Sequence, residues 1–187
     1  GALGLFASVG SFRYVTVKQL VQSWSAIEID DLAGGFIGVT GLTMGVSDVD
    51  VQVNQTNTLA RLDWNGLSLT AGSLVNPNVD ISRVLFAEGD ASLDAFGFVK
   101  AVARFTLDKQ VVSGTDGAGT TLANAELFDF TLTGAEVFIG VGASFDENGT
   151  PTVYGDDEID TTGALGLFAS VGSFRYVTVK QLVQSWS

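Results

Sequence analysis

The first 25 residues of the chain recur, letter for letter, as its last 25. Residues 1–25 read GALGLFASVGSFRYVTVKQLVQSWS, and residues 163–187 read the same, at an offset of 162 positions. Independent selection on two similar strands would not keep every polar position identical, so this is a copied unit. A fixed long period is typical of repeat arrays, in which each unit packs against its neighbours.

The duplication divides the chain into one full repeat, residues 1–162, and the start of the next, residues 163–187. A weaker similarity splits the repeat into halves, about 1–93 and 94–162. In this similarity Phe12 matches Phe105, and Lys18-Gln19 matches Lys109-Gln110. The first residue is Gly1 and not Met, so we expect a segment of a much longer chain.

Charge and composition exclude several classes of function. The chain has no Cys and no His, so it has no disulfides, no Cys/His zinc sites and no His-based catalysis. All 21 acidic residues but only seven of the nine basic ones lie in residues 1–162, which gives one repeat a net charge of −14. A polyanion does not bind nucleic acid, whose phosphates require Lys and Arg. Charged or amide side chains interrupt every apolar run, so we expect no membrane insertion.

Hydrophobic periodicity predicts an all-β protein. Val49, Val51 and Val53 alternate with polar residues, and Phe128 and Phe130 do the same, which is the two-residue period of a strand. The pair Asn65-Gly66 stands between short alternating segments and predicts a two-residue hairpin there.

Two all-β architectures remain open. Glycines recur with a mean step of about 23 residues, at positions 10, 41, 66, 89, 114, 134, 155 and 172. This step favours a β-solenoid-like fibre with coils of about 23 residues, because whole coils can be gained or lost in a solenoid. The alternative is two tandem β-sandwich domains of about 80 residues each.

Two places hold candidate site residues. The acidic segments after Phe145 gather oxygen ligands of the type that calcium prefers, so they are the candidate metal site, although solvated acidic turns would look the same. The ligands would come from Asp146, Asn148, Asp156, Asp157, Glu158 and Asp160. Trp64, beside the predicted turn, could stack on a sugar or a partner protein if exposed, or else close the core.

No arrangement of residues supports catalysis, so we expect the chain not to be an enzyme. Carboxylate pairs are present, but 21 acidic residues make such pairs inevitable by chance. No glycine-rich loop leads into a helix to hold a phosphate.

Three segments of the chain are similar to those of a known class of repeat proteins: LARLDWNGLSLTAGSLV, LFDFTLTGAEVFIGVGASF and the duplicated segment. The chain resembles the repeat regions of giant bacterial secreted or cell-surface proteins, such as adhesin-like extender arrays. The resemblance implies an extracellular or cell-surface stalk or fibre, partnered by adjacent copies of the same repeat and often rigidified by calcium. The alternatives are an adhesive module that binds a glycan or a cell-surface partner, and a subunit of a self-assembling filament or sheath.

Overall fold

The computed structural model describes residues 3–58, 60–68 and 76–181, which form strands, turns and loops. No helix in this part of the chain is long and apolar enough to cross a membrane. The strands are β1 (Gly4–Gln19), β2 (Gln22–Ile37), β3 (Leu42–Thr56), β4 (Arg83–Ala95), β5 (Val99–Thr115), β6 (Thr121–Val141), β7 (Ser144–Asp146), β8 (Glu158–Asp160) and β9 (Leu165–Lys180). The predicted all-β class is therefore confirmed.

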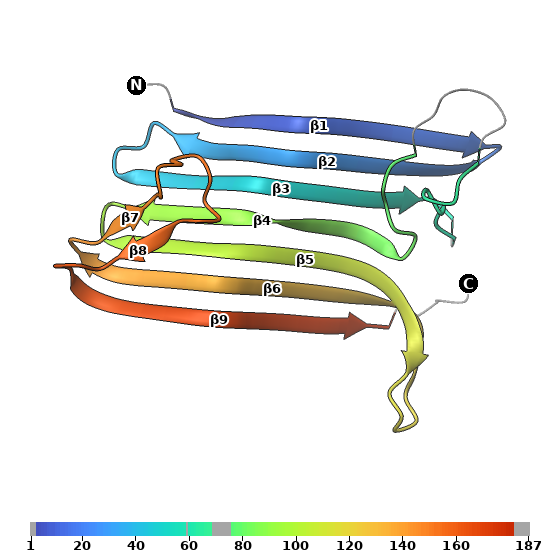
Figure 1. The fold of residues 1–187 in the computed structure, drawn as a ribbon. Helices are drawn as coiled ribbons and strands as arrows, with labels where there is room; N and C mark the ends of the chain where they lie inside the picture. Colours follow the sequence, from blue (N-terminus) through green and yellow to red (C-terminus); the bar gives the residue numbers. More distant parts are fainter. Residues whose placement is uncertain (1–2, 59, 69–75, 182–187) are drawn as a thin grey trace.

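Seven of the strands form one antiparallel sheet, in the order β1-β2-β3-β4-β5-β6-β9. Each strand pairs with the next strand in the chain, except that the small β7–β8 hairpin intervenes between β6 and β9. Figure 1 shows the long strands side by side in a single layer, with β1 and β9 at opposite edges. The two edge strands, β1 and β9, therefore come from the two copies of the duplicated segment.

This meander differs from both expected architectures. A solenoid of 23-residue coils requires the chain to circle in one direction, whereas here it reverses after every long strand. A sandwich requires two packed sheets, but the second sheet in the described part is only the two-stranded β7–β8 pair. Gly10, Gly89, Gly134 and Gly172 lie inside β1, β4, β6 and β9. The recurring step therefore reflects long strands and their connections, and not coils.

The two-residue hairpin predicted at Asn65-Gly66 does not form. Neither residue has a positive φ, as a type I′ turn requires, and no strand begins or ends beside them in the described segment 60–68. The Gly66 amide instead donates to Asp63 Oδ1 (3.0 Å), so an aspartate side chain closes this bend. The hairpin prediction is wrong because this segment packs on the large sheet and forms no ladder of its own.

The sheet has two unlike faces, because residues directly opposite on paired strands point to the same side. One row across all seven strands is apolar throughout: Phe12, Ile29, Val51, Ala87, Leu107, Phe130 and Tyr176. A second apolar row is Leu5, Phe36, Met44, Leu93, Ala101, Val137 and Ala169. We call the side that carries these rows the apolar face.

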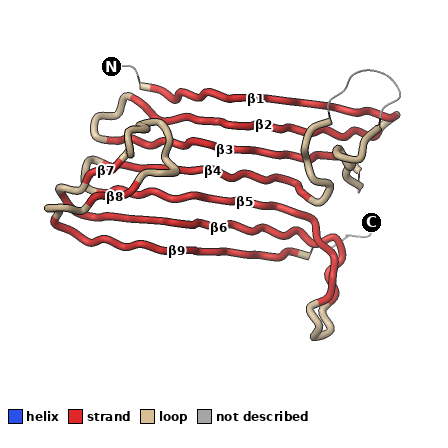
Figure 2. The backbone as a smooth tube through the Cα atoms, viewed as in Figure 1, coloured by secondary structure: helices blue, strands red, loops and turns tan. Residues whose placement is uncertain are grey.

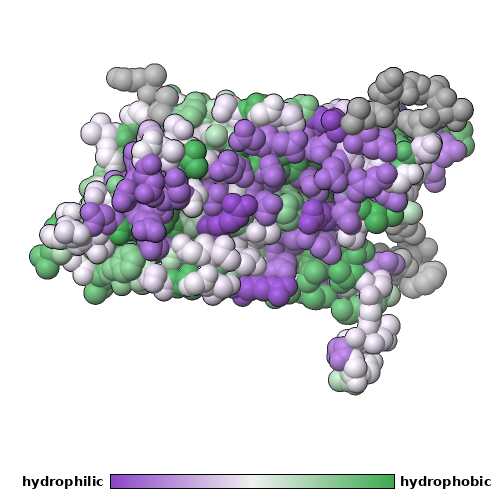
Figure 3. Space-filling view, in the orientation of Figure 1, coloured by the Kyte–Doolittle hydropathy of each residue, from purple (hydrophilic) through white to green (hydrophobic). Residues whose placement is uncertain are grey.

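The opposite side, here called the loop face, carries a mainly polar row. Its members are Arg13, Glu28, Gln52, Phe86, Asp108, Asp129 and Val177. Two connections lie over this face, the one between β3 and β4 and the one between β6 and β9 that contains the β7–β8 hairpin (Figure 2). Seen from this side, the middle of the molecule is predominantly hydrophilic (Figure 3).

Bulges keep the two faces separate along strands of such length. β2, β3 and β6 each carry an extra residue near the middle, where the register shifts relative to a neighbour. Asp31, Asp48 and Gly134 hold positive φ angles of 55°, 50° and 58° at these sites. A bulge reverses the in–out alternation. The sequence changes phase at the same points, so the two apolar rows lie on the same face of the sheet on either side of the bulges.

Two small clusters of buried residues form the core, both on the loop face. One joins Ala26 of β2 to Trp64 and Val79 of the β3–β4 connection. The other joins Val102 of β5 and Phe138 of β6 to Ile159 of β8. The core therefore lies between the sheet and the connections that cover its loop face.

Candidate functional site

The acidic hairpin is the first place where the structure brings candidate site residues together. β7 and β8 pair antiparallel with Asp146 opposite Glu158, so carboxylates from both acidic segments lie on one small hairpin. Between the strands, the side-chain amide of Asn148 donates to the backbone oxygen of Asp156 (2.6 Å). The backbone N–H of Asn148 donates to Asp146 Oδ1 (3.2 Å). The loop is thus closed by its own side chains.

Asp157 carries the strongest electrostatic perturbation at this hairpin. Partial burial, and then the nearby charges of Asp156, Glu147 and Asp146, raise the pKa of Asp157 to about 6. Its Oδ1 is buried without a hydrogen-bond partner. Burial and repulsion from these carboxylates therefore disfavour the ionised form of Asp157.

Asp160 lies at the far end of β8 and does not join this cluster. It accepts a hydrogen bond from the Thr162 amide (2.8 Å), and hydrogen bonds to Thr162 hold its pKa below the usual value. Within the described ranges, no group of three or more acidic, His or Cys side chains converges as a set of metal ligands. Calcium binding at Asp146, Asn148, Asp156, Asp157, Glu158 and Asp160 stays a prediction.

Trp64 is fully buried on the loop face. It packs against Ala26 and Val79, and its Nε1 donates to Asn54 Oδ1 (3.2 Å). Asn54, which is also fully buried, donates in turn to the Leu62 backbone oxygen (3.1 Å). This position favours the core role of Trp64 over the ligand-stacking role, because a buried ring has no face open to a sugar.

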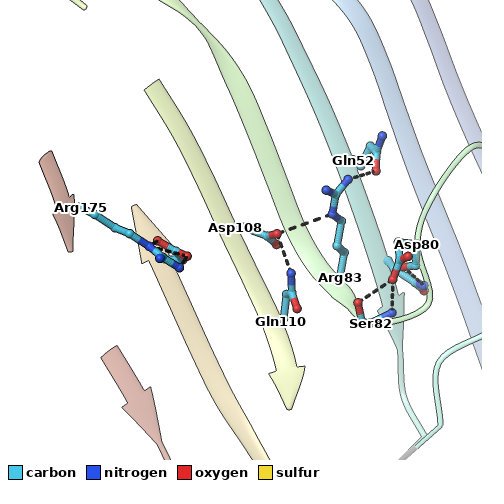
Figure 4. A network of polar contacts seen from close by, with 9 residues as sticks. Gln52, Asp80, Ser82, Arg83, Asp108, Gln110 and Arg175 are labelled. Atoms are coloured by element: carbon cyan, nitrogen blue, oxygen red, sulfur yellow. Dashed lines mark hydrogen bonds and ion pairs between the residues drawn. The ribbon is translucent and has the colours of Figure 1, made fainter. Parts of the chain in front are cut away.

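Charged side chains form a network along the loop face. Arg83 of β4 donates to Gln52 Oε1 of β3 (2.9 Å) and lies 3.7 Å from Asp108 of β5, so it links three strands (Figure 4). Its guanidinium also lies over the Phe86 ring, 3.8 Å from the centroid. Partly exposed ion pairs of this kind add little stability, about 0–1 kcal/mol each.

Arg104 makes a second link in this network, nearer the acidic hairpin. It donates to Asp90 Oδ2 at 3.0 Å and lies 3.9 Å from Glu88. Burial raises the pKa of Asp90 although Arg104 opposes the shift. In this network the guanidinium groups of Arg83 and Arg104 lie against carboxylates.

The two edge strands, β1 and β9, are a further candidate functional feature, because one sequence pairs with two different neighbours. β1 pairs with β2 through one side of the duplicated segment, and β9 pairs with β6 through the other side of the same segment. Arg13 donates to Glu28 of β2 (2.8 Å), while its copy Arg175 donates to Asp129 of β6 (3.0 Å). Hydrogen bonds from Arg175 hold the pKa of Asp129 below its usual value. One repeated arginine is therefore used towards both neighbours.

These observations define the class of the protein. It is an all-β protein with one seven-stranded antiparallel sheet of long strands, and the two edge strands share one sequence. A comparison with known protein families, curated proteins and solved structures finds no match to the chain.

Reasoning from the sequence did not place the two copies at opposite edges of one sheet, and it missed the uncovered apolar face. The signals were present, since the duplicated segment lies at both ends of the chain and apolar alternation continues along every long strand. Alternation shows that two faces differ, but it does not show which strands pair or whether a second layer covers a face.

Proposed function

We propose that this chain is a structural unit of a long fibre or stalk, in which successive repeats continue one β-sheet edge to edge. The supporting observation is that the same segment pairs with β2 through one side and with β6 through the other. In an array, one copy of the segment would make both pairings at once. It would be the last strand of one repeat and the first strand of the next.

The side chains of the duplicated segment are compatible with both neighbours. In the continued sheet, a single arginine equivalent to Arg13 and Arg175 would lie between Glu28 of one repeat and Asp129 of the preceding one. Both ion pairs already exist separately at the two edges, at 2.8 and 2.5 Å. The segment needs no new conformation to take the shared position, since it is a β-strand at both ends.

The resemblance to adhesin-like extenders, together with the acidic, Cys-free composition, supports an extracellular or cell-surface location and adjacent repeats as the partners. A non-enzymatic role fits the loop face, where four arginines lie against carboxylates: Arg13, Arg83, Arg104 and Arg175. The burial of Trp64 makes glycan binding at that residue a weaker alternative. Assembly from separate chains is the remaining alternative, because the same edges could meet without a covalent link.

The growth of the molecule with repeat number tests this proposal. Each repeat contributes six strands, β1 to β6, so each added copy should lengthen the sheet by roughly 29 Å at about 4.8 Å per strand. Chains with one, two and three repeats would be compared by small-angle X-ray scattering at several concentrations. Extension by a different step, or separate globules joined by linkers, would contradict the proposal. A length that depended on concentration would favour assembly from separate chains.

A further inference from the structure

The apolar face has no covering layer in the described part of the chain. The β3–β4 connection and the β7–β8 hairpin both lie over the opposite, loop face (Figure 2). Large side chains of the apolar face are correspondingly open, with 78% of Leu5, 62% of Phe12 and 52% of Tyr176 exposed. Antiparallel sheets normally keep one face solvated and bury the other. Here the solvated, polar side is the partly covered one.

The dimensions of this face match those of a stable protein interface. Seven strands at about 4.8 Å are roughly 34 Å wide, and the ten residues from Leu5 to Tyr14 span roughly 33 Å. The area is therefore about 1,100 Å², against about 800 Å² per partner in a standard interface. Exposed apolar patches on monomers are generally only a few hundred Å².

The distribution of charge suits contact between two identical faces. The ion pairs of Arg13, Arg83, Lys100, Arg104 and Arg175 belong to the loop face. The ion pair of Lys109 with Glu126 (3.0 Å) lies towards one end of the apolar face, where strand register also places Lys18 and Lys180. The two apolar rows carry no charge, so their burial would leave no unpaired carboxylate between the sheets.

We propose that the apolar face packs against the same face of a second copy of this chain. The two sheets would lie about 10 Å apart, as in other face-to-face sheet pairs. Both loop faces, with their acidic connections, would point outwards into solvent. This interface is separate from the edges, and so it does not depend on the proposed edge-to-edge continuation of repeats.

Sedimentation of the full chain with matched phenylalanine variants tests this interface. Phe12 and Phe174 lie on the apolar face, whereas Phe6 and Phe168 lie on the loop face of the same two strands. Their exposures are similar, 49% for Phe174 and 47% for Phe168. We expect a dimer for the unmodified chain, at least tenfold weaker association for F12E/F174E, and unchanged association for F6E/F168E. Equal effects of the two double substitutions would overturn the proposal.

Thiol protection on the central strand distinguishes face pairing from edge pairing. The chain has no Cys, so A87C on the apolar face and E88C on the loop face would each carry a single thiol. A dimer formed through the apolar faces should slow maleimide labelling of A87C at least tenfold relative to E88C. Equal labelling of the two thiols would overturn the proposal. So would a monomeric chain that binds neutral phosphatidylcholine vesicles, which would assign the face to lipid.

Discussion

Trp64 and Asn54 show how single residues fix the β3–β4 connection on the sheet. Trp64 has the largest fully buried side chain in the described ranges, and its indole N–H is satisfied by the Asn54 amide oxygen at 3.2 Å. Asn54 also donates to the backbone oxygens of Leu62 and Asp80, so it joins both ends of the connection to β3. Buried polar groups of this kind are costly to leave without partners.

Trp64→Ala should therefore destabilise the protein by about 3–5 kcal/mol, since it leaves a cavity and removes a partner from buried Asn54. Urea unfolding followed by circular dichroism measures the change. Leu20→Ala is the control, because Leu20 is 99% exposed and its removal should cost under about 0.5 kcal/mol. A small effect of Trp64→Ala would show that the connection does not depend on this residue.

Asp157 should make the protein less stable as pH rises from 5 to 7. Its pKa is raised from 3.8 to about 6 in the folded state, so the folded protein holds the proton more tightly than the unfolded chain. Its ionisation therefore progressively destabilises the fold as pH rises from about 4 to 6, and the loss is complete above that range. Burial also raises the pKa of Asp90, which adds an effect of the same sign.

Urea unfolding at pH 5 and pH 7 tests this prediction. Asp157→Asn should reduce the difference in unfolding free energy between the two pH values. Asp160→Asn should leave the difference in place, because the pKa of Asp160 is lowered and its contribution changes only below about pH 4. The account of Asp157 fails if the two variants respond to pH in the same way.

At the scale of strands, β1 and β9 have the same sequence but different neighbours. Loss of β9 would expose the edge of β6, whose natural partner is the side of the duplicated segment that β1 leaves free. An exposed edge of this kind accepts a strand from another chain. The truncated chain thus has two free strand edges, β6 and β1, that can pair with each other when they belong to different molecules.

Deletion of residues 163–187 should therefore convert the chain into a head-to-tail polymer, because β1 of one molecule can pair with β6 of the next. Light scattering and electron microscopy would detect the polymer. A free peptide of residues 163–187 should block its growth by capping β6, whereas a scrambled peptide should not. A truncated chain that keeps the oligomeric state of the full chain, or a polymer that ignores the peptide, would contradict the prediction.

The element scale also shows how far the sequence could predict the fold. The alternation of Val49, Val51 and Val53 with polar residues predicted a strand, and these residues lie in β3 as expected. The turn at Leu20-Val21 has no Gly, Asn or Pro signal, yet Leu20 takes a φ of 54° there. The pairing of β1 with β2 over 16-residue strands outweighs the local preference at that turn. The order of the strands could not be predicted, because a two-residue period shows which side chains share a face of the sheet but not which strands pair with each other.

The structure brings Asp146, Asn148, Asp156 and Asp157 to one hairpin, where the sequence indicated acidic loops. Calcium binding by these residues stays a prediction. The arginine network could not be predicted, because Arg83 meets Gln52 and Asp108 only through the register of three strands. That register shifts at the Asp48 bulge, between β3 and β4, and again between Arg83 and Leu85 in the pairing of β4 with β5. The alternation of apolar and polar residues gives no clear signal for such shifts.

At the scale of the whole molecule, a continuous fibre requires the outer side of β9 to be a pairing surface for the next repeat. Among the described strands of the present chain, none pairs with the outward-pointing amides of β9 or with those of β1. A chain lengthened after Ser187 by a second copy of residues 26–162 would supply the missing partner of β9, while β1 would stay at the edge.

Amide hydrogen exchange of this lengthened chain, resolved by NMR with segmental labelling, is the most direct measurement. β1 and β9 share one sequence, so their intrinsic exchange rates are the same and β1 serves as an internal reference. We predict that exchange of the outward amides of β9 becomes slow, as in an interior strand, while exchange of those of β1 remains fast. Fast exchange on the outer side of β9 in the lengthened chain would contradict this prediction.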